Sequence, residues 1–331
     1  MKIYNKNDIQ TNFALYGLIL IAFGFSTYLF LIFFALFRRF IYFLHFIDKS
    51  YILEALWFTG APIVIGFFLI FIDLFLKVKL KRNLKEISTN AIQKKGITVA
   101  LTAYNDEESI GLAVKNFLNS PHVLRVIVIN NNSTDKTGMI AKRNGAIVFN
   151  EAKQGYGSCV YRALKEASAY KDSELICLCE GDMTFRAEDL DKFLAYISHA
   201  DVVNGTRIVE QLQHANTQIT IFMHYGNLAV AKLLEFKYLG TVTLTDVGTT
   251  YKLIRKKALK KILPQLNSDI NLEFNPYLIE KFIQNRLKVI ECPISFFPRI
   301  GKSKGGNISN KVAFFLGIKM IFGIIFGWKS E

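Results

Sequence analysis

ITVALTAYNDEESIGLAVKNFLNSPHVLRVIVI, residues 97–129, is the stretch that decides the fold. It opens with a short apolar run of high strand propensity at 97–103 and closes with a second such run at 125–129. The intervening residues 106–118 have apolar side chains at helical spacing, namely Ile110, Ala113, Val114 and Phe117. The stretch therefore predicts a strand, a helix and a second strand, the repeating unit of parallel sheets.

The same alternation continues toward the C-terminus. Further helices are expected at 133–144, 156–169 and 190–197, and further strands at 146–149, 175–178 and 202–203. Strands that alternate with helices predict right-handed crossovers and an α/β fold with a doubly wound, Rossmann-like, mostly parallel sheet. Such sheets bind ligands beyond the carboxyl ends of their strands.

Three loops at those carboxyl ends are unusually polar. They read TAYNDEE from residue 102, NNNSTDKT from residue 130 and EGDMTF from residue 180. Because the carboxyl ends of parallel strands lie at one edge of a sheet, these loops should converge on a ligand. In the third loop Glu180 and Asp182 are separated by one small residue directly after an apolar strand. Carboxylate oxygens are common ligands of Mg²⁺ and Mn²⁺, and either ion can also bind the phosphates of a substrate.

Six segments, in order, give the chain a family resemblance. They are AYNDEESI from residue 103, NNNSTDKT from 130, EGDMTF from 180, NGTR from 204, TDVGTTYKLIRKKAL from 245 and PRIGKSKGG from 298. Together they resemble the motifs of the family-2 glycosyltransferases with the GT-A fold. Within that family they most resemble the polyprenyl-phosphate glycosyltransferases, the group that includes dolichol-phosphate mannose synthase. The resemblance covers residues 97–306.

The resemblance implies a role for each matching residue. A nucleoside pocket would be lined by Thr102, Tyr104, Asp106 and Asn131. The metal ion and the diphosphate would be held by Glu180, Gly181, Asp182 and Thr184. Phosphates would be faced by Arg207, Arg299 and Lys304, and Asp246 would position an acceptor or sugar hydroxyl. The implied donor is a UDP- or GDP-hexose, the implied acceptor is a polyprenyl phosphate or another lipid, and the implied reaction inverts the anomeric centre.

The chain departs from the family pattern at several of these positions. Thr102 stands where the family usually has Pro, and Asp106 where it has Glu. Asn130 and Asn131 stand where Asp is frequent, so the loop brings amide groups rather than charge to the nucleobase. Glu180 replaces the first Asp of the metal triplet. The donor base and the strength of the Glu180 ligand are therefore open at this point.

The N-terminal part has the composition of a membrane anchor. Residues 13–37 carry no charge and residues 55–76 carry only Asp73, so both runs are long enough to span a bilayer of about 30 Å. Residues 1–76 are therefore expected to form a transmembrane hairpin, 77–96 a basic juxtamembrane linker and 97–306 the catalytic domain. The Lys and Arg residues after the second span place that domain in the cytoplasm of a multi-pass protein, in the inner membrane if the protein is bacterial.

The C-terminal residues 307–331 are apolar apart from a few lysines. Val312 to Trp328 is short for a span and Lys319 lies in its middle, which favours an interfacial helix over a membrane-inserted one. The net charge of +14 fits an anionic lipid surface or an anionic substrate. Zinc-finger spacing and aromatic RNA-binding motifs are missing from the sequence, so nucleic acid is not expected as a partner. A homo-oligomer is compatible with the sequence.

Three other functions compete with this interpretation. A processive polysaccharide synthase usually carries Gln-x-x-Arg-Trp, but the two Trp residues, Trp57 and Trp328, do not follow an Arg. A glycosyltransferase could instead use another lipid, a glycan or a protein as its acceptor. A membrane scaffold that has lost catalysis would explain Asn130, Asn131 and Glu180. Such a scaffold should not bind a nucleotide diphosphate in a metal-dependent manner.

Overall fold

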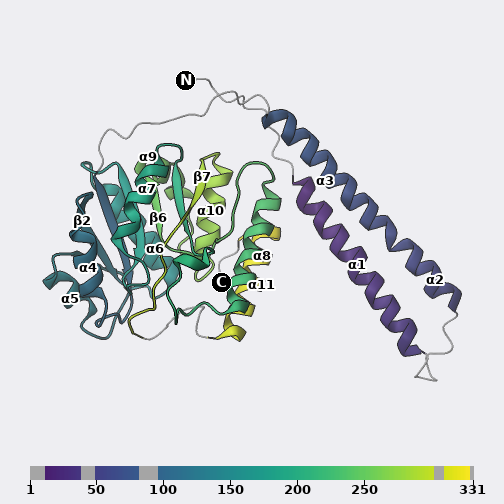
Figure 1. Ribbon diagram of the computed structural model, residues 1–331, viewed down its shortest axis with the longest axis horizontal. Helices are drawn as coiled ribbons and strands as arrows, with labels where there is room; N and C mark the ends of the chain where they lie inside the picture. Colours follow the sequence, from purple (N-terminus) through teal and green to yellow (C-terminus); the bar gives the residue numbers. More distant parts are fainter. Residues whose placement is uncertain (1–11, 39–48, 82–95, 302–308, 329–331) are drawn as a thin grey trace. The chain divides into compact units, whose positions relative to one another are not determined.

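The structure, a computed structural model, describes residues 12–38, 49–81, 96–301 and 309–328. The chain divides into two compact units (Figure 1). One comprises residues 1–85 together with 235–241, and the other comprises residues 86–234 and 242–331.

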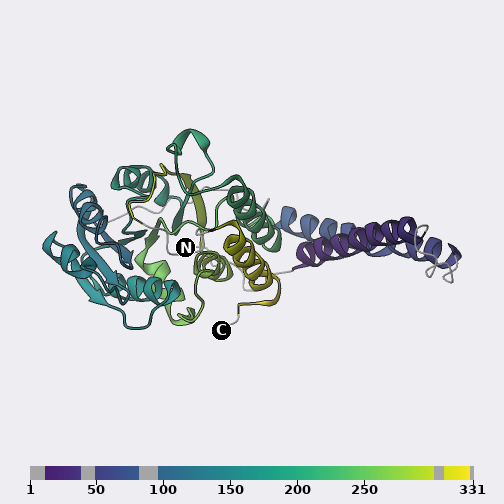
Figure 2. The same cartoon turned by 90° about the horizontal axis from the view of Figure 1, so that it is seen from below.

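The N-terminal unit contains a helical hairpin. Helix α1 (Phe13–Arg38) packs along α3 (Gly60–Lys81), which follows the shorter α2 (Lys49–Phe58) (Figures 1 and 2). By length and composition, Phe13–Arg38 and Ser50–Leu76 could each cross a membrane. Only 6% and 11% of their apolar windows are buried, which is unlike the core helices of a soluble protein. The two expected spans thus correspond to helices, the second beginning a few residues early.

Small residues bring α1 and α3 into backbone contact. A Cβ added at Gly66 would lie 2.5 Å from the carbonyl oxygen of Gly17, and one added at Gly17 would lie 2.4 Å from that of Gly66. Asp73, the charge that interrupts the second apolar run, is buried and accepts the Ala14 N–H at 3.0 Å. Its carboxylate therefore satisfies an unpaired amide at the positive end of α1.

We expect Gly66→Val to separate the two helices, because the added side chain must displace the backbone of α1. Gly60→Val is the matched control, since a Cβ there meets nothing within 4 Å. The detergent-solubilised protein is titrated with SDS, and the measurement is the proportion of SDS at which the hairpin becomes susceptible to proteolysis. Gly66→Val should lower that proportion and Gly60→Val should not. Equal behaviour of the two variants would argue against close helix contact.

The larger unit is built on a seven-stranded sheet of order β3-β2-β1-β4-β6-β5-β7. Its strands are β1 (Ile97–Ala103), β2 (Val123–Asn130), β3 (Ile147–Asn150), β4 (Leu175–Glu180), β5 (Val202–Thr206), β6 (Lys252–Arg255) and β7 (Val289–Pro293). Strand β6 runs antiparallel to both of its neighbours, and the other pairs are parallel. The expected α/β fold with a mostly parallel sheet is confirmed.

Helices cover both faces of this sheet. On one face α4 (Ile110–Leu118), α5 (Thr137–Arg143) and α7 (Leu190–Ile197) share an apolar core with alternate residues of β1 and β4. On the other lie α6 (Tyr156–Ala169), α9 (Lys256–Ile262) and α10 (Phe274–Gln284). Residues of β1 are completely buried, which explains the unbroken apolar run that predicted it.

Two predicted helices begin later than expected. Helix α4 starts at Ile110 rather than Asp106, and α5 starts at Thr137 rather than at residue 133. In both cases polar side chains hold the preceding residues in a loop. Ser133 Oγ accepts the Asn105 N–H at 3.0 Å, and Asp135 accepts the Thr137 N–H at 2.9 Å. Short polar side chains that bond to nearby backbone favour loops over helix interiors.

The remaining two α-helices in the described part of the chain are α8 (Ile221–Lys237) and α11 (Asn310–Phe326). They lie side by side (Figure 2). Near their N-termini the rings of Phe222 and Phe314 are 6.4 Å apart, and Thr220 Oγ donates to Asn310 Oδ1 at 2.8 Å. The end of α11 is fixed on α10, because the Trp328 indole N–H donates to the buried Glu280. With 17 residues, α11 is about 26 Å long, shorter than a typical hydrocarbon core.

Candidate active site

The three polar loops meet at one edge of the sheet. Residue pairing places Ala103 beside Asn130 and Thr102 beside Glu180, so β1, β2 and β4 end at the same level. The Asn131 N–H donates to Ala103 O at 2.9 Å, and the Gly181 N–H donates to Thr102 O at 3.0 Å. The convergence expected from the sequence is therefore present, and the last residues of the strands hold the loops together.

A strained turn shapes the loop after β4. Met183 has φ of 66°, a left-handed conformation that costs a residue with a Cβ about 1–2 kcal/mol. This turn brings the Thr184 N–H and hydroxyl to Oδ1 of Asp182, at 3.0 and 2.5 Å. The neighbouring Gly181 is closely packed, because an added Cβ would lie 2.5 Å from Ile110 Cδ1 and 3.3 Å from Thr102 O. The turn holds Asp182 in one orientation beneath the strand ends.

Glu180 and Asp182 share one cation, the guanidinium of Arg299. Nη2 of Arg299 lies 2.6 Å from Asp182 Oδ2 and 3.1 Å from Glu180 Oε2. Oδ2 of Asp182 receives no well-directed hydrogen bond, so its contact with Arg299 is ionic. The backbone of the Arg299 segment is tied to the same loop, since the Ile300 N–H donates to Asp182 O at 3.1 Å.

This cluster has the composition of a divalent-cation site. Burial, and after it the Glu180 carboxylate, raise the pKa of Asp182 to about 7 despite the opposing effect of Arg299. A single guanidinium thus leaves the carboxylate pair under-compensated. Two carboxylates around one cationic position, one of them with an oxygen lacking a hydrogen-bond donor, fit Mg²⁺ or Mn²⁺. Among the described residues no larger cluster of metal-binding side chains is found.

A network of side-chain hydrogen bonds that was not predicted from the sequence holds the carboxylate of Glu180 in place. Thr250 Oγ donates to Glu180 Oε1 at 2.6 Å, and the Tyr156 hydroxyl is hydrogen-bonded to Thr250 Oγ. Asn275 donates to the Tyr156 hydroxyl at 2.8 Å and to Gly248 O at 3.0 Å. The only sequence signal was that Thr250 lies inside the TDVGTTYKLIRKKAL segment. Tyr156 and Asn275 belong to other elements, and only the fold brings them to Glu180.

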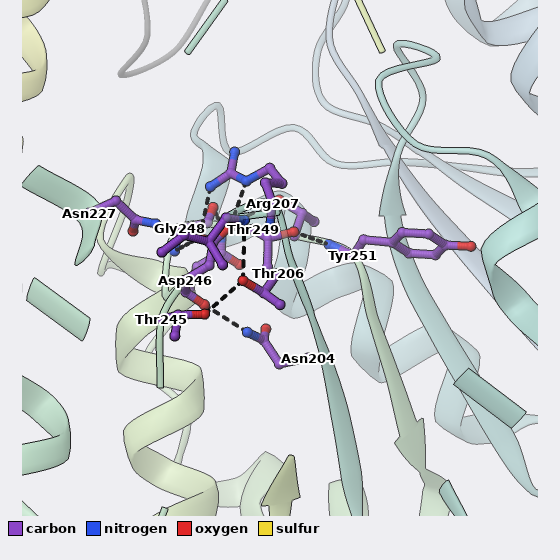
Figure 3. Close-up of polar contacts among 12 residues, drawn as sticks. Asn204, Thr206, Arg207, Asn227, Thr245, Asp246, Gly248, Thr249 and Tyr251 are labelled. Carbon is purple, nitrogen blue, oxygen red and sulfur yellow. Dashed lines mark hydrogen bonds and ion pairs between the residues drawn. The ribbon is translucent and has the colours of Figure 1, made fainter. Parts of the chain in front are cut away.

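Arg207 and Asp246 form a second, fully formed ion pair (Figure 3). Nε and Nη2 of Arg207 donate to the two oxygens of Asp246 at 2.7 and 2.9 Å, a bidentate arrangement. Burial would raise the pKa of Asp246, but Arg207 outweighs it and lowers the pKa to about 2. Asp246 was expected to position a substrate hydroxyl, yet its oxygens are occupied by protein donors. Its contacts instead indicate that it holds Arg207.

Asn131 is likewise occupied by the protein. Its amide nitrogen donates to Glu151 O and Lys153 O at 3.3 and 2.8 Å, and its Oδ1 accepts the Gly155 N–H at 2.9 Å. Asn131 therefore shapes the loop that precedes α6. We infer that a nucleobase would meet this loop rather than a free Asn131 amide.

One cavity of about 660 Å³ collects almost all of the predicted site residues. Its wall includes Thr102, Tyr104, Asp106, Asn131, Glu180, Asp182, Thr184, Arg207, Asp246 and Arg299. Gly181 is not on the wall, consistent with its packing role, and Lys304 lies outside the described residues. His224 of α8 also lies on the cavity wall.

The far half of the cavity is apolar and lies between two helices. Helix α8 contributes Phe222, Met223 and Val230, and α11 contributes Leu316 and Met320 among others. Large apolar side chains on these helices also remain exposed outside the cavity, namely Ile221, Tyr225, Phe315, Phe322 and Phe326. The cavity thus joins a charged end at the strands to an apolar end between the helices.

Residues 98–263, half of the chain, match the family model described as glycosyl transferase family 2. The chain therefore belongs to glycosyl transferase family 2, as its segments suggested, and the matched range contains all of them except PRIGKSKGG from residue 298.

Several proteins of known sequence or structure are similar to this chain. A "Dolichyl-phosphate hexose transferase" of Haloferax volcanii is 28% identical, over 63% of this chain and 86% of the relative. An uncharacterized protein of Methanocaldococcus jannaschii is 27% identical, over 71% of this chain and 93% of the relative. Glucosyl-3-phosphoglycerate synthase of Mycobacterium tuberculosis, solved with Mn²⁺ and UDP-glucose, shares the fold, with a TM-score of 0.50 and 16% identity over 71% of this chain and 80% of that protein.

Proposed function

We propose that this protein is an inverting glycosyltransferase that moves a hexose from a UDP- or GDP-hexose to a polyprenyl phosphate at the cytoplasmic face of a membrane. The observation that carries the proposal is the two-part cavity. Its charged end suits a sugar diphosphate and a phosphate nucleophile, and its apolar end between α8 and α11 suits a hydrocarbon chain. A soluble acceptor would not need the apolar end.

The charged end accounts for the chemistry of transfer. The acceptor phosphate oxygen is already anionic near neutral pH, so it needs alignment with the anomeric carbon more than it needs a general base. Nη1 of Arg207 has no protein partner among the described residues and is available to an acceptor phosphate. Thr102, Tyr104 and Asp106 line the side of the cavity assigned to the nucleoside.

In this proposal Glu180 and Asp182 hold a divalent cation. When bound, the ion would neutralise charge on the departing nucleotide diphosphate. Arg299 would then be released from the carboxylates to face the same phosphates, together with Lys304. The Mn²⁺ and UDP-glucose of the Mycobacterium tuberculosis synthase support the choice of metal and donor class.

Three observations support a lipid acceptor and a membrane site. The Haloferax volcanii relative is a dolichyl-phosphate hexose transferase by name. The exposed apolar side chains of α8 and α11 fit insertion into a membrane interface. Two apolar helices precede the catalytic domain, and the basic residues after them favour the cytoplasmic side. We retain residues 1–76, 77–96, 97–306 and 307–331 as the hairpin, the linker, the catalytic domain and the interfacial helix.

The test is transfer of radiolabelled sugar by the purified full-length protein with Mn²⁺ and a panel of UDP- and GDP-hexoses. The acceptors are polyprenyl phosphate, the matching polyprenol without phosphate, and a short-chain alkyl phosphate. We expect product with polyprenyl phosphate, none with the alcohol, and a KM at least about tenfold higher for the short alkyl phosphate because it buries less apolar surface. Equal use of the alcohol, or transfer only to soluble acceptors, would refute the lipid-phosphate assignment.

A further inference from the structure

The carboxylate of Asp246 receives five hydrogen bonds (Figure 3). Arg207 provides three of them through its backbone N–H, Nε and Nη2, at 3.1, 2.7 and 2.9 Å. The Gly248 N–H provides the fourth at 3.0 Å, and Nδ2 of Asn227 provides the fifth at 2.6 Å. Two carboxylate oxygens offer about four lone-pair sites, so five donors are more than are needed to satisfy the buried carboxylate. The bond from Asn227 is therefore not explained by charge burial alone.

Asn227 differs from the other donors in its origin. Arg207 directly follows β5 and Gly248 lies in the loop before β6, but Asn227 belongs to α8. On that helix it is flanked at i−4 and i+3 by Met223 and Val230, which line the apolar end of the cavity. The same helix face thus contacts both the proposed lipid tail and the Asp246–Arg207 pair. An added Cβ at Gly248 would lie 3.1 Å from both Asn227 Oδ1 and Arg207 Nη2, which shows how closely the three groups pack.

We infer that Asn227 is a positioning residue that couples the lipid-lined wall of α8 to the phosphate-facing guanidinium of Arg207. Asn227 fixes the Asp246 carboxylate, the carboxylate fixes Nε and Nη2 of Arg207, and the remaining Nη1 is aimed at the acceptor phosphate. A lipid chain between α8 and α11 sets the position of α8 and thereby the position of this guanidinium. The inference rests on the proposed function and adds a link between the charged end and the apolar end of the cavity.

The first test separates acceptor use from donor use. Asn227→Ala should raise the KM for polyprenyl phosphate by about tenfold, the effect of losing one hydrogen bond to a charged group. The KM for the nucleotide-sugar should stay within about twofold, because donor binding does not need Arg207 to face the acceptor. A general loss of folding would instead lower the melting temperature and impair the use of both substrates together.

The second test uses a pH profile. Asn227→Asp keeps the shape but places a carboxyl against Asp246, and a like charge raises the pKa of the new group. The protonated form can donate to Asp246 and the ionised form repels it, so acceptor transfer by Asn227→Asp should fall as pH rises. The ionisable groups around this position are Asp246, Arg207, Glu291, which accepts the Asp246 backbone N–H, the buried Lys252, and His224 on α8. These groups are also present in the wild-type protein, so its pH profile is the baseline with which the profile of Asn227→Asp is compared.

Asn119→Asp, at the exposed end of α4, is the matched control and should follow the wild-type profile. The inference is overturned if Asn227→Ala leaves the KM for polyprenyl phosphate unchanged, or if it raises the KM values for both substrates equally. It is also overturned if Asn227→Asp and Asn227→Ala share one pH profile. Failure of the proposed function looks different, because the wild-type protein itself would then transfer no sugar to polyprenyl phosphate.

Discussion

The Asp182→Asn protein should fold normally, and its rate of glycosyl transfer should fall by more than about a hundredfold. This loss exceeds that expected for replacing a residue that only hydrogen-bonds to a metal ligand. The change removes the charge that a divalent cation requires and keeps the shape of the side chain. The amide oxygen of the new residue can still accept the hydrogen bonds that Thr184 donates to Oδ1. The turn at Met183 should therefore persist. Removing a buried carboxylate whose pKa is raised by burial should also not destabilise the fold.

Two measurements check this prediction on the same preparations. One is transfer to polyprenyl phosphate, and the other is the thermal shift produced by UDP or GDP with and without Mn²⁺. Asp182→Asn should lose the Mn²⁺-dependent part of the shift while keeping the melting temperature of the free protein. Asp191→Asn, at an exposed residue that pairs with His122, should resemble wild type. Near-normal transfer by Asp182→Asn would remove the metal assignment.

The sequence was sufficient to predict the half of the fold that is built from local repeats. Strand β1 and helices α6 and α7 begin and end at the expected residues. Each of these elements is a buried strand or a helix with one apolar face, and polar loops flank it. The pattern that identifies it therefore lies within about fifteen consecutive residues. The convergence of the loops after β1, β2 and β4 followed because parallel strands end at a common edge.

The second half of the sheet was not predictable in this way. Strand β6 has four residues, lies antiparallel between β4 and β5, and pairs with segments far away in the sequence. The hydrogen-bond partners of Asp246 were not predictable for the same reason, since Arg207 and Asn227 are brought to it only by tertiary structure. A motif identifies a polar residue, but its hydrogen-bond partners decide whether it meets substrate or protein.

Arg299→Gln should change metal binding and catalysis in opposite directions. Nη2 of Arg299 lies against both carboxylates, so it occupies the position that a divalent cation would need. Removing this charge should raise the affinity for Mn²⁺ alone by about tenfold or more, because a competing positive charge is lost from a buried site. The same change removes a phosphate-binding guanidinium, so transfer should fall by roughly a hundredfold.

The direction of the metal effect distinguishes two roles of Arg299. If Arg299 only held Glu180 and Asp182 in place for the metal, its loss would weaken Mn²⁺ binding, since the carboxylates would repel each other and move apart. If it competes with the metal, its loss strengthens binding, and nucleotide diphosphate then no longer assists metal entry by drawing the guanidinium away. Titration calorimetry with Mn²⁺, with and without UDP or GDP, measures both quantities. Arg143→Gln, an exposed arginine of α5, controls for the change in net charge. Weaker Mn²⁺ binding by Arg299→Gln than by Arg143→Gln would establish the holding role and contradict competition.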